Sequence, residues 1–170
     1  MKKIIPALFV IIGFSSCYSY KIFPAEYRQY QYSGEKKKAF VINPELKKEY
    51  AIVSQSGIFT LIADSTDESA VKIKLQKMDR RFTCGEPAIA SMITLGQIPV
   101  LFPDRYEYQF DEITATGTVN RKFELLIAQR LWFWDVFKLK KHFTEKAGKA
   151  LMGNYYNPSH TEAVAAIKHS

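Results

Sequence analysis

The sequence predicts an α+β fold, with a mostly antiparallel, sandwich-like β-sheet and a C-terminal helix. Two short segments, VKIKL at 71–75 and YEYQF at 106–110, alternate apolar and polar residues as half-buried strands do. Near the end of the chain, Ala147, Leu151 and Tyr155 recur every four residues, which places them on one side of a helix. The ten Tyr and twelve Phe residues also favour β structure.

The first 16 residues have the layout of a secretory signal peptide. Lys2 and Lys3 supply the positive start, and residues 4–14 are almost all apolar. Because a helix needs roughly 20 apolar residues to cross a bilayer, this run is too short to span a membrane. Small residues follow it, and then comes Cys17. A simpler interpretation is an ordinary secretory signal with a chance cysteine near its end.

The sequence Phe14-Ser15-Ser16-Cys17 resembles the lipobox of bacterial lipoproteins. The resemblance implies that the chain is cleaved before Cys17, that its thiol is diacylated, and that the new amino end is acylated. Phe14 departs from the commoner leucine at its position. Because two or more acyl chains anchor a protein stably, the expected partner of Cys17 is a lipid bilayer.

The remaining chain is predicted to comprise three parts. Residues 17–38 are rich in Tyr, Lys and Gln without a clean apolar period, so we interpret them as the acylated cysteine and a tether. Residues 39–156 are expected to form a single globular domain, and residues 157–170 a polar tail. The net charge of +7, of which the signal peptide carries two lysines, fits contact with anionic lipid and does not suggest nucleic-acid binding.

Within the globular part, apolar patterning and turn residues predict the elements in order. We expect a short apolar strand at 39–42, one or two helical turns at 44–50 capped by Asn43, and strands at 50–54 and 58–63. The later elements are strands at 71–75, 106–110 and 118–127, with Gly117 as a bulge, and a helix at 144–155 capped by Thr144.

The stretch TLGQIP, followed by an alternating aromatic strand and a tryptophan-containing segment, is similar to small, uncharacterised bacterial lipoproteins. The matching residues are Thr94, Leu95, Gly96, Ile98, Pro99, Tyr106 to Phe110, Trp132 and Trp134. The tyrosine-rich start after Cys17 resembles lipoproteins of Bacteroidota. This resemblance implies a fold type and no particular activity.

Catalytic and metal-binding motifs are not evident in the sequence. The three histidines lack a metal-ligand spacing, so no metal or other cofactor is expected. Cys84 is interpreted as a buried, inert thiol near the segment between Pro87 and Pro99. The alternative is an envelope hydrolase or thiol enzyme that uses Cys84, for instance with His142. A carboxylate pair for glycoside chemistry would have to come from Asp104, Asp111 and Glu112.

An aromatic segment near the end of the last predicted strand is a candidate interaction patch. It consists of Leu131, Trp132, Phe133, Trp134 and Phe137. The alternative is that these side chains pack in the core. The expected function is a non-enzymatic, lipid-anchored envelope protein that acts as a structural, assembly or binding factor, with an envelope protein as a further partner.

The residues that follow Cys17 predict which bacterial membrane holds the protein. By resemblance to known lipoprotein sorting rules, an Asp beside the cysteine would retain the protein at the inner membrane, and that position is Tyr18. By the same kind of resemblance, lipoproteins of Bacteroidota need acidic residues within the first few positions after the cysteine for export to the cell surface. In this chain the first acid after Cys17 is Glu26. The expected location is the periplasmic side of the outer membrane.

Overall fold

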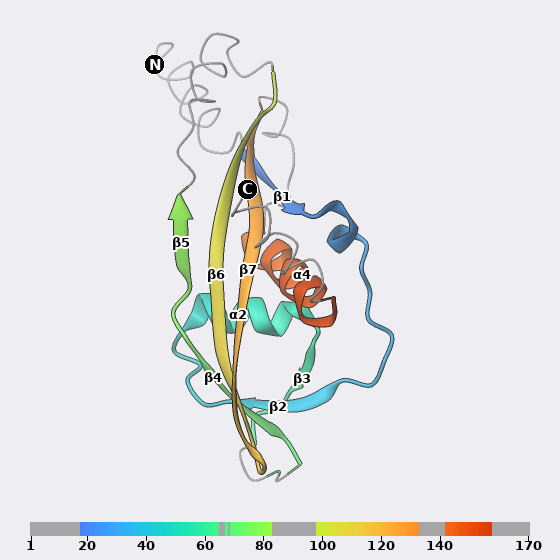
Figure 1. Cartoon of the computed structure of the whole chain (residues 1–170), viewed down its shortest axis with the longest axis vertical. Helices are drawn as coiled ribbons and strands as arrows, with labels where there is room; N and C mark the ends of the chain where they lie inside the picture. The colour runs from blue at the N-terminus through green and yellow to red at the C-terminus, as the bar shows by residue number, and fades with distance from the viewer. Residues whose placement is uncertain (1–17, 65–66, 68, 83–97, 133–141, 158–170) are drawn as a thin grey trace, which may run out of the picture.

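A long antiparallel hairpin forms the centre of the fold (Figure 1). The computed structural model describes residues 18–64, 67, 69–82, 98–132 and 142–157. Strands β6 (Val100–Thr114) and β7 (Gly117–Leu131) each contain 15 residues. Thr114 pairs with Gly117, so the two strands are joined by a two-residue turn. Gly117 has a φ of 147°, which a residue with a Cβ rarely adopts. It therefore begins the strand at a tight turn, where the sequence had suggested a bulge.

Among the described residues, seven strands join into one mixed sheet. Its order is β1-β7-β6-β4-β2-β3, and β5 also pairs with β6. The pairings of β2 with β3 and with β4 are parallel, and the others are antiparallel. The remaining bounds are Tyr18–Phe23 for β1, Lys37–Val41 for β2, Phe59–Leu61 for β3, Val71–Leu75 for β4 and Asp79–Phe82 for β5.

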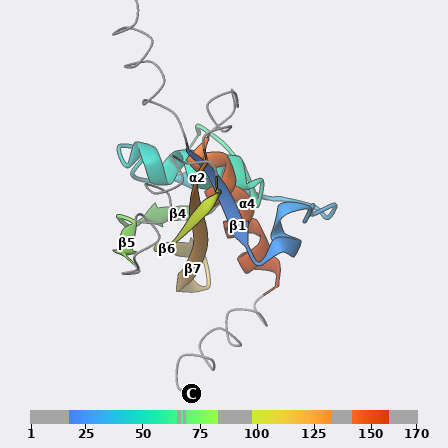
Figure 2. The same cartoon turned by 90° about the horizontal axis from the view of Figure 1, so that it is seen from above.

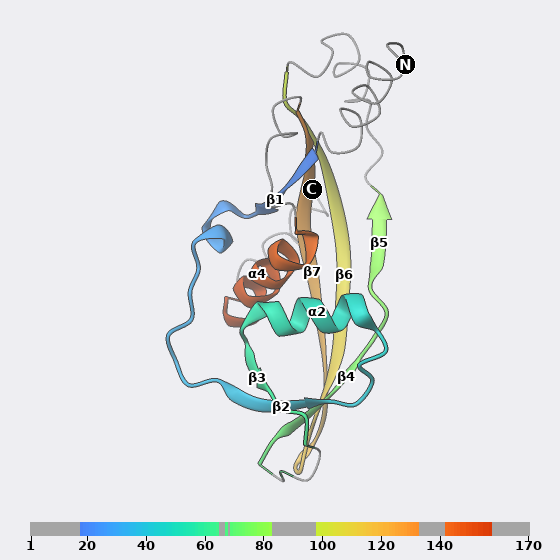
Figure 3. The same cartoon turned by 180° about the vertical axis from the view of Figure 1, so that it is seen from behind.

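The structure confirms the α+β class, the mostly antiparallel sheet and the C-terminal helix. Helices α2 (Lys47–Ser56) and α4 (Phe143–Tyr156) pack on the sheet, and a short 3-10 helix, η1, spans Ala25–Arg28 (Figures 2 and 3). The layer that faces the described sheet is therefore helical, and not a second sheet as the expected sandwich-like arrangement would require. Helix α4 extends the predicted helix by one residue at each end, and His142, not Thr144, is its cap residue.

Helix α2 replaces the strand that was expected at 50–54. Its buried residues are Glu49, Ile52, Val53 and Ser56, a spacing that belongs to one face of a helix. Gly57, with a φ of 67°, ends the helix in the left-handed conformation. Asn43 does not cap this helix. Its side chain instead exchanges hydrogen bonds of 2.8 and 2.9 Å with the backbone of Leu75 in β4.

The core lies between the helices and the inner face of the hairpin. Alternate residues of β6, namely Tyr106, Tyr108 and Phe110, are buried there. The Tyr108 hydroxyl donates a 2.7 Å hydrogen bond to the backbone carbonyl of Glu49 in α2. This bond satisfies a buried polar group and attaches the helix to the central strand. Burial also raises the pKa of Tyr108 far above its ordinary value, so the hydroxyl remains a donor.

The segment predicted to be a tether belongs to the fold. Strand β1 pairs along its whole length with β7, and Ile22 is 1% exposed. Tyr27 of η1 is equally buried, against Gly153 of α4. A Cβ at position 153 would come within 2.4 Å of the Tyr27 ring, so this packing requires glycine. The prediction that the globular part starts at residue 39 is therefore wrong. Tyr18, Tyr20 and Ile22 do alternate with polar residues as in a strand, but this run is only six residues long and is followed by Pro24.

Two neighbouring substitutions in β1 test this correction. We expect Ile22→Ala to lower the free energy of unfolding by about 2–4 kcal/mol, since it leaves a cavity in the core. Lys21→Ala, one residue away and half-buried, should change it by no more than about 0.5 kcal/mol. Urea unfolding of the two variants measures the difference. If both variants match the wild type, the segment acts as a tether.

Candidate functional site

Three strand ends meet at one end of the sheet, which we call the anchor end. Strand β1 begins there at Tyr18, β7 ends there at Leu131, and β6 begins there at Val100 (Figure 1). The register places these three residues side by side in one row. Residue 17 is bonded to Tyr18, and consecutive Cα atoms are about 3.8 Å apart. Cys17 is therefore bonded directly to the first residue of the sheet.

Apolar side chains are exposed at the anchor end. Ile98 is 56% exposed and Leu101 is 38% exposed. Trp132 is half-buried, and the guanidinium carbon of Arg130 lies 4.9 Å from the centre of its ring. Ile98, Leu101 and Arg130 do not stand out in the sequence as part of an interaction surface, because only the register, which pairs Val100 with Leu131 and Leu101 with Arg130, brings their segments to the same end of the sheet.

Several predicted site residues lie outside the described residues. These are Cys17, Cys84, Phe133, Trp134 and Phe137. Of the predicted patch, Leu131 is paired in the sheet and Trp132 follows it. His142 is exposed immediately before α4. The acylation of Cys17 and the role of Cys84 therefore stay predictions.

The acidic residues considered for glycoside chemistry do not form a catalytic pair. Asp104 and Glu112 are both buried on the inner face of β6, eight residues apart, which corresponds to roughly 26 Å along a strand. Carboxylates in glycosidases lie within about 10 Å of each other. Asp111 alternates with Glu112 and therefore faces the opposite side of the sheet.

Each buried carboxylate instead has structural partners. Asp104 accepts hydrogen bonds from Arg80 at 2.6 Å and from the Tyr106 hydroxyl at 3.3 Å. Burial, and next the charge of Asp104, raise the pKa of Tyr106 to about 12. Tyr106 therefore stays protonated at neutral pH and donates to the carboxylate.

Glu112 has an equivalent arrangement at the other end of the hairpin. Glu112 accepts a 2.8 Å hydrogen bond from the Tyr155 hydroxyl of α4, and it forms an ion pair of 3.3 Å with Arg121. Burial, and then this hydrogen bond, raise the pKa of Tyr155. The hydrogen bond from Tyr155 attaches α4 to the sheet, whereas the contacts of Asp104 join strands β5 and β6.

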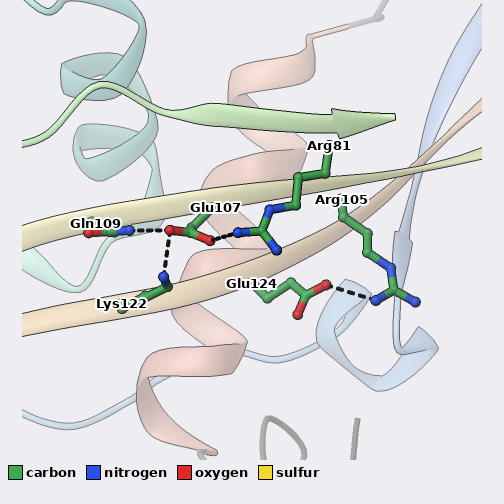
Figure 4. Close-up of polar contacts among 6 residues, drawn as sticks. All are labelled: Arg81, Arg105, Glu107, Gln109, Lys122 and Glu124. Atoms are coloured by element: carbon green, nitrogen blue, oxygen red, sulfur yellow. Dashed lines mark hydrogen bonds and ion pairs between the residues drawn. The ribbon is translucent and has the colours of Figure 1, made fainter. Parts of the chain in front are cut away.

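A network of charged side chains covers the outer face of the hairpin (Figure 4). Glu107 accepts hydrogen bonds from Arg81 at 2.9 Å, from Lys122 at 2.6 Å and from Gln109. Arg105 and Glu124 form a neighbouring ion pair of 3.3 Å. The hydrogen bond from Lys122 is the main reason that the pKa of Glu107 is lowered. Because opposite charges are paired across the strands, this face is suited to contact with water.

A shallow groove of about 210 Å³ lies between β1 and α4. Its lining is basic and includes Lys21, Arg28, Lys146 and Lys149. Among the described residues, no three His, Cys, Asp or Glu side chains are grouped to hold a metal ion. In the same part of the chain, none of the helices has the length and hydropathy needed to cross a membrane.

The comparisons with known proteins give no sequence match and a weak structural likeness. No protein-family profile matches the sequence, and no characterised protein matches it either. The fold is similar to a crystal structure of a minor lipoprotein from Acinetobacter baumannii, at 14% sequence identity. The alignment covers 79% of this chain and 94% of the other, with a TM-score of 0.29. A TM-score this low carries no argument about the fold or the role of the present chain.

The charged network predicts a specific dependence of stability on pH. The pKa of Glu107 in the folded state is below its ordinary value of 4.5. The Glu107 carboxylate therefore contributes to the free energy of unfolding above pH 4.5, and this contribution is lost as the pH falls through the lowered pKa. We expect the wild type to lose stability more steeply than Glu107→Gln between neutral pH and about pH 3. Urea unfolding at several pH values over this range measures how steeply the free energy of unfolding of each protein falls with pH.

Glu45→Gln is the matched control. It removes one carboxylate at an exposed position outside the network, so the free energy of unfolding should fall with pH as steeply as in the wild type. Identical slopes for the wild type and Glu107→Gln would contradict the assignment of the pKa shift.

Proposed function

We propose that this chain is a lipid-anchored lipoprotein of the bacterial cell envelope with a non-enzymatic structural, assembly or binding role. The observation that carries the proposal is the junction between Cys17 and Tyr18. The lipobox-like sequence ends at the residue before strand β1 begins. An acyl chain on Cys17 would therefore be attached to the folded sheet without a spacer.

The physical chemistry of the anchor supports this proposal. Each methylene buried in a bilayer contributes about 0.8 kcal/mol, so one acyl chain binds marginally and two or more bind stably. A diacylated thiol with an acylated amino end meets that condition. The signal peptide at 1–16 directs export, and Cys17 becomes the first residue of the mature chain.

The partners of the buried acids support a non-enzymatic role. Asp104 and Glu112 are both engaged in hydrogen bonds that join elements of the fold. The outer face of the hairpin is a network of paired charges. The alternative, an envelope hydrolase or thiol enzyme that uses Cys84, would require a site formed by residues outside the described part of the chain.

We place the protein on the periplasmic side of the outer membrane. Tyr18, and not an acidic residue, follows Cys17, and Glu26 is the first acid of the mature chain. This assignment rests on resemblance to sorting rules of known lipoproteins.

Substitution of the lipobox cysteine tests the proposed anchor. We expect Cys17→Ser to abolish acylation, because an oxygen replaces the thiol that carries the diacylglyceryl group, and to leave the chain uncleaved or released from membranes. Membrane fractionation and the mass of the mature amino end measure this. Cys84→Ser makes the same atomic change elsewhere and should behave as the wild type. Normal fractionation of Cys17→Ser, with no lipid mass on the wild type, would refute the anchor.

The assignment to one leaflet is tested separately. Added protease should leave the wild-type protein intact in whole cells and digest it after the outer membrane is permeabilised. Tyr18→Asp should move the protein to inner-membrane fractions, because it supplies the acidic retention residue. Digestion in intact cells would place the protein on the cell surface, and co-sedimentation of the wild type with the inner membrane would contradict the sorting argument.

A further inference from the structure

We propose that the folded domain stands end-on on the membrane, with Ile98, Leu101 and Trp132 of the anchor end at the level of the lipid head groups. This inference rests on the proposed acylation of Cys17, and it specifies which part of the domain meets the bilayer. The occupant of the exposed apolar surface at the anchor end is therefore the lipid to which the chain is attached.

The register of the sheet limits how far Trp132 lies from the anchor. Cys17 is bonded to Tyr18, Tyr18 pairs with Leu131, and Leu131 is bonded to Trp132. Two Cα–Cα steps of about 3.8 Å and one strand spacing of about 5 Å place the Cα atoms of Cys17 and Trp132 within about 13 Å. The interfacial layer of one leaflet is about 5–8 Å thick. Acyl chains on Cys17 would therefore draw this end of the sheet to the interface.

The side chains at the anchor end suit that position. Trp is enriched at membrane interfaces, where its ring meets the acyl boundary and its N–H meets water. Ile98 and Leu101 add exposed apolar surface at the same end of the sheet. Arg130, stacked on Trp132, adds positive charge where anionic lipid phosphates lie.

The outer face of the hairpin and its far end are less suitable surfaces for contact with the lipid. On the outer face of the hairpin, the carboxylates of Glu107 and Glu124 are paired with cationic side chains, and this charged face would have to give up its contact with water if the domain lay flat. The far end is the turn between Thr114 and Gly117, where hydroxyl groups hydrogen-bond one another and the backbone. Val119, 48% exposed, is an isolated apolar side chain near that turn. The 15-residue strands would hold this turn roughly 50 Å from the membrane.

Depth-dependent tryptophan quenching tests the orientation. The acylated mature chain with Trp134→Phe keeps Trp132 as its only tryptophan. It is reconstituted into vesicles of phosphatidylethanolamine and phosphatidylglycerol, with or without acyl chains brominated near the head group. We expect the brominated lipid to remove about half of the Trp132 emission, as for a ring at the interface. The mass of the protein verifies acylation, and flotation with the vesicles verifies attachment.

A probe at the opposite end is the matched control. In the background of Trp132→Phe and Trp134→Phe, the substitution Val119→Trp places the single tryptophan near the far turn, where the brominated lipid should leave its emission unchanged. Leu101→Asp should reduce the quenching of Trp132, whereas Val119→Asp should not. Circular dichroism verifies that each variant is folded.

The outcomes separate this inference from the proposed function. If acylated protein floats with the vesicles and Trp132 is unquenched, the anchor stands and the end-on orientation is wrong. Equal quenching of Trp132 and of the tryptophan introduced at position 119 would indicate a domain lying flat, which also overturns the inference. If the mature chain carries no lipid, the proposed function fails and the orientation fails with it.

Discussion

The burial of one face of strand β6 is the constraint on which the rest of the structure depends. This strand pairs with β7, β4 and β5, so it joins most of the sheet. Its inward-facing Tyr106, Tyr108 and Phe110 need a cover, and helices α2 and α4 supply it. The hydrogen bond from Tyr108 to the Glu49 carbonyl sets where α2 crosses the strand. Without that apolar row, the helices would have no surface to pack on.

The polar residues of the inner face have a related structural part. Asp104 and Glu112 lie beyond the two ends of the aromatic row, and each meets an arginine and a tyrosine hydroxyl. A buried carboxylate is costly unless it is paired and hydrogen-bonded, so these contacts offset the cost of placing charge beside the core. They also explain why acids that attract attention in the sequence as catalytic candidates are occupied in the fold.

The absence of a spacer between the proposed anchor and the sheet has a mechanical consequence. A long flexible tether would let a domain sample many positions above the membrane, whereas a strand hydrogen-bonded from its first residue restricts it. Strand β1 is fixed along β7, and its Ile22 and the neighbouring Tyr27 are buried in the core. With the proposed anchor at Cys17, the long hairpin would point in a defined direction, which would suit the proposed structural or binding role better than free diffusion of a tethered module.

The sequence by itself determined the features that depend on local pattern, namely the alternating strands 71–75 and 106–110 and the C-terminal helix. The signal-like start and the lipobox-like cysteine stay predictions from the sequence. Tertiary structure decided the rest. A helix replaced the strand expected at 50–54, because Ile52 and Val53 pack on a sheet that the local window does not contain. The segment after Cys17 became a strand because β7 offered it an edge, and the register of the long β6–β7 hairpin placed Leu101 opposite Arg130. Period and composition are local properties, whereas pairing and burial depend on residues far away in the chain.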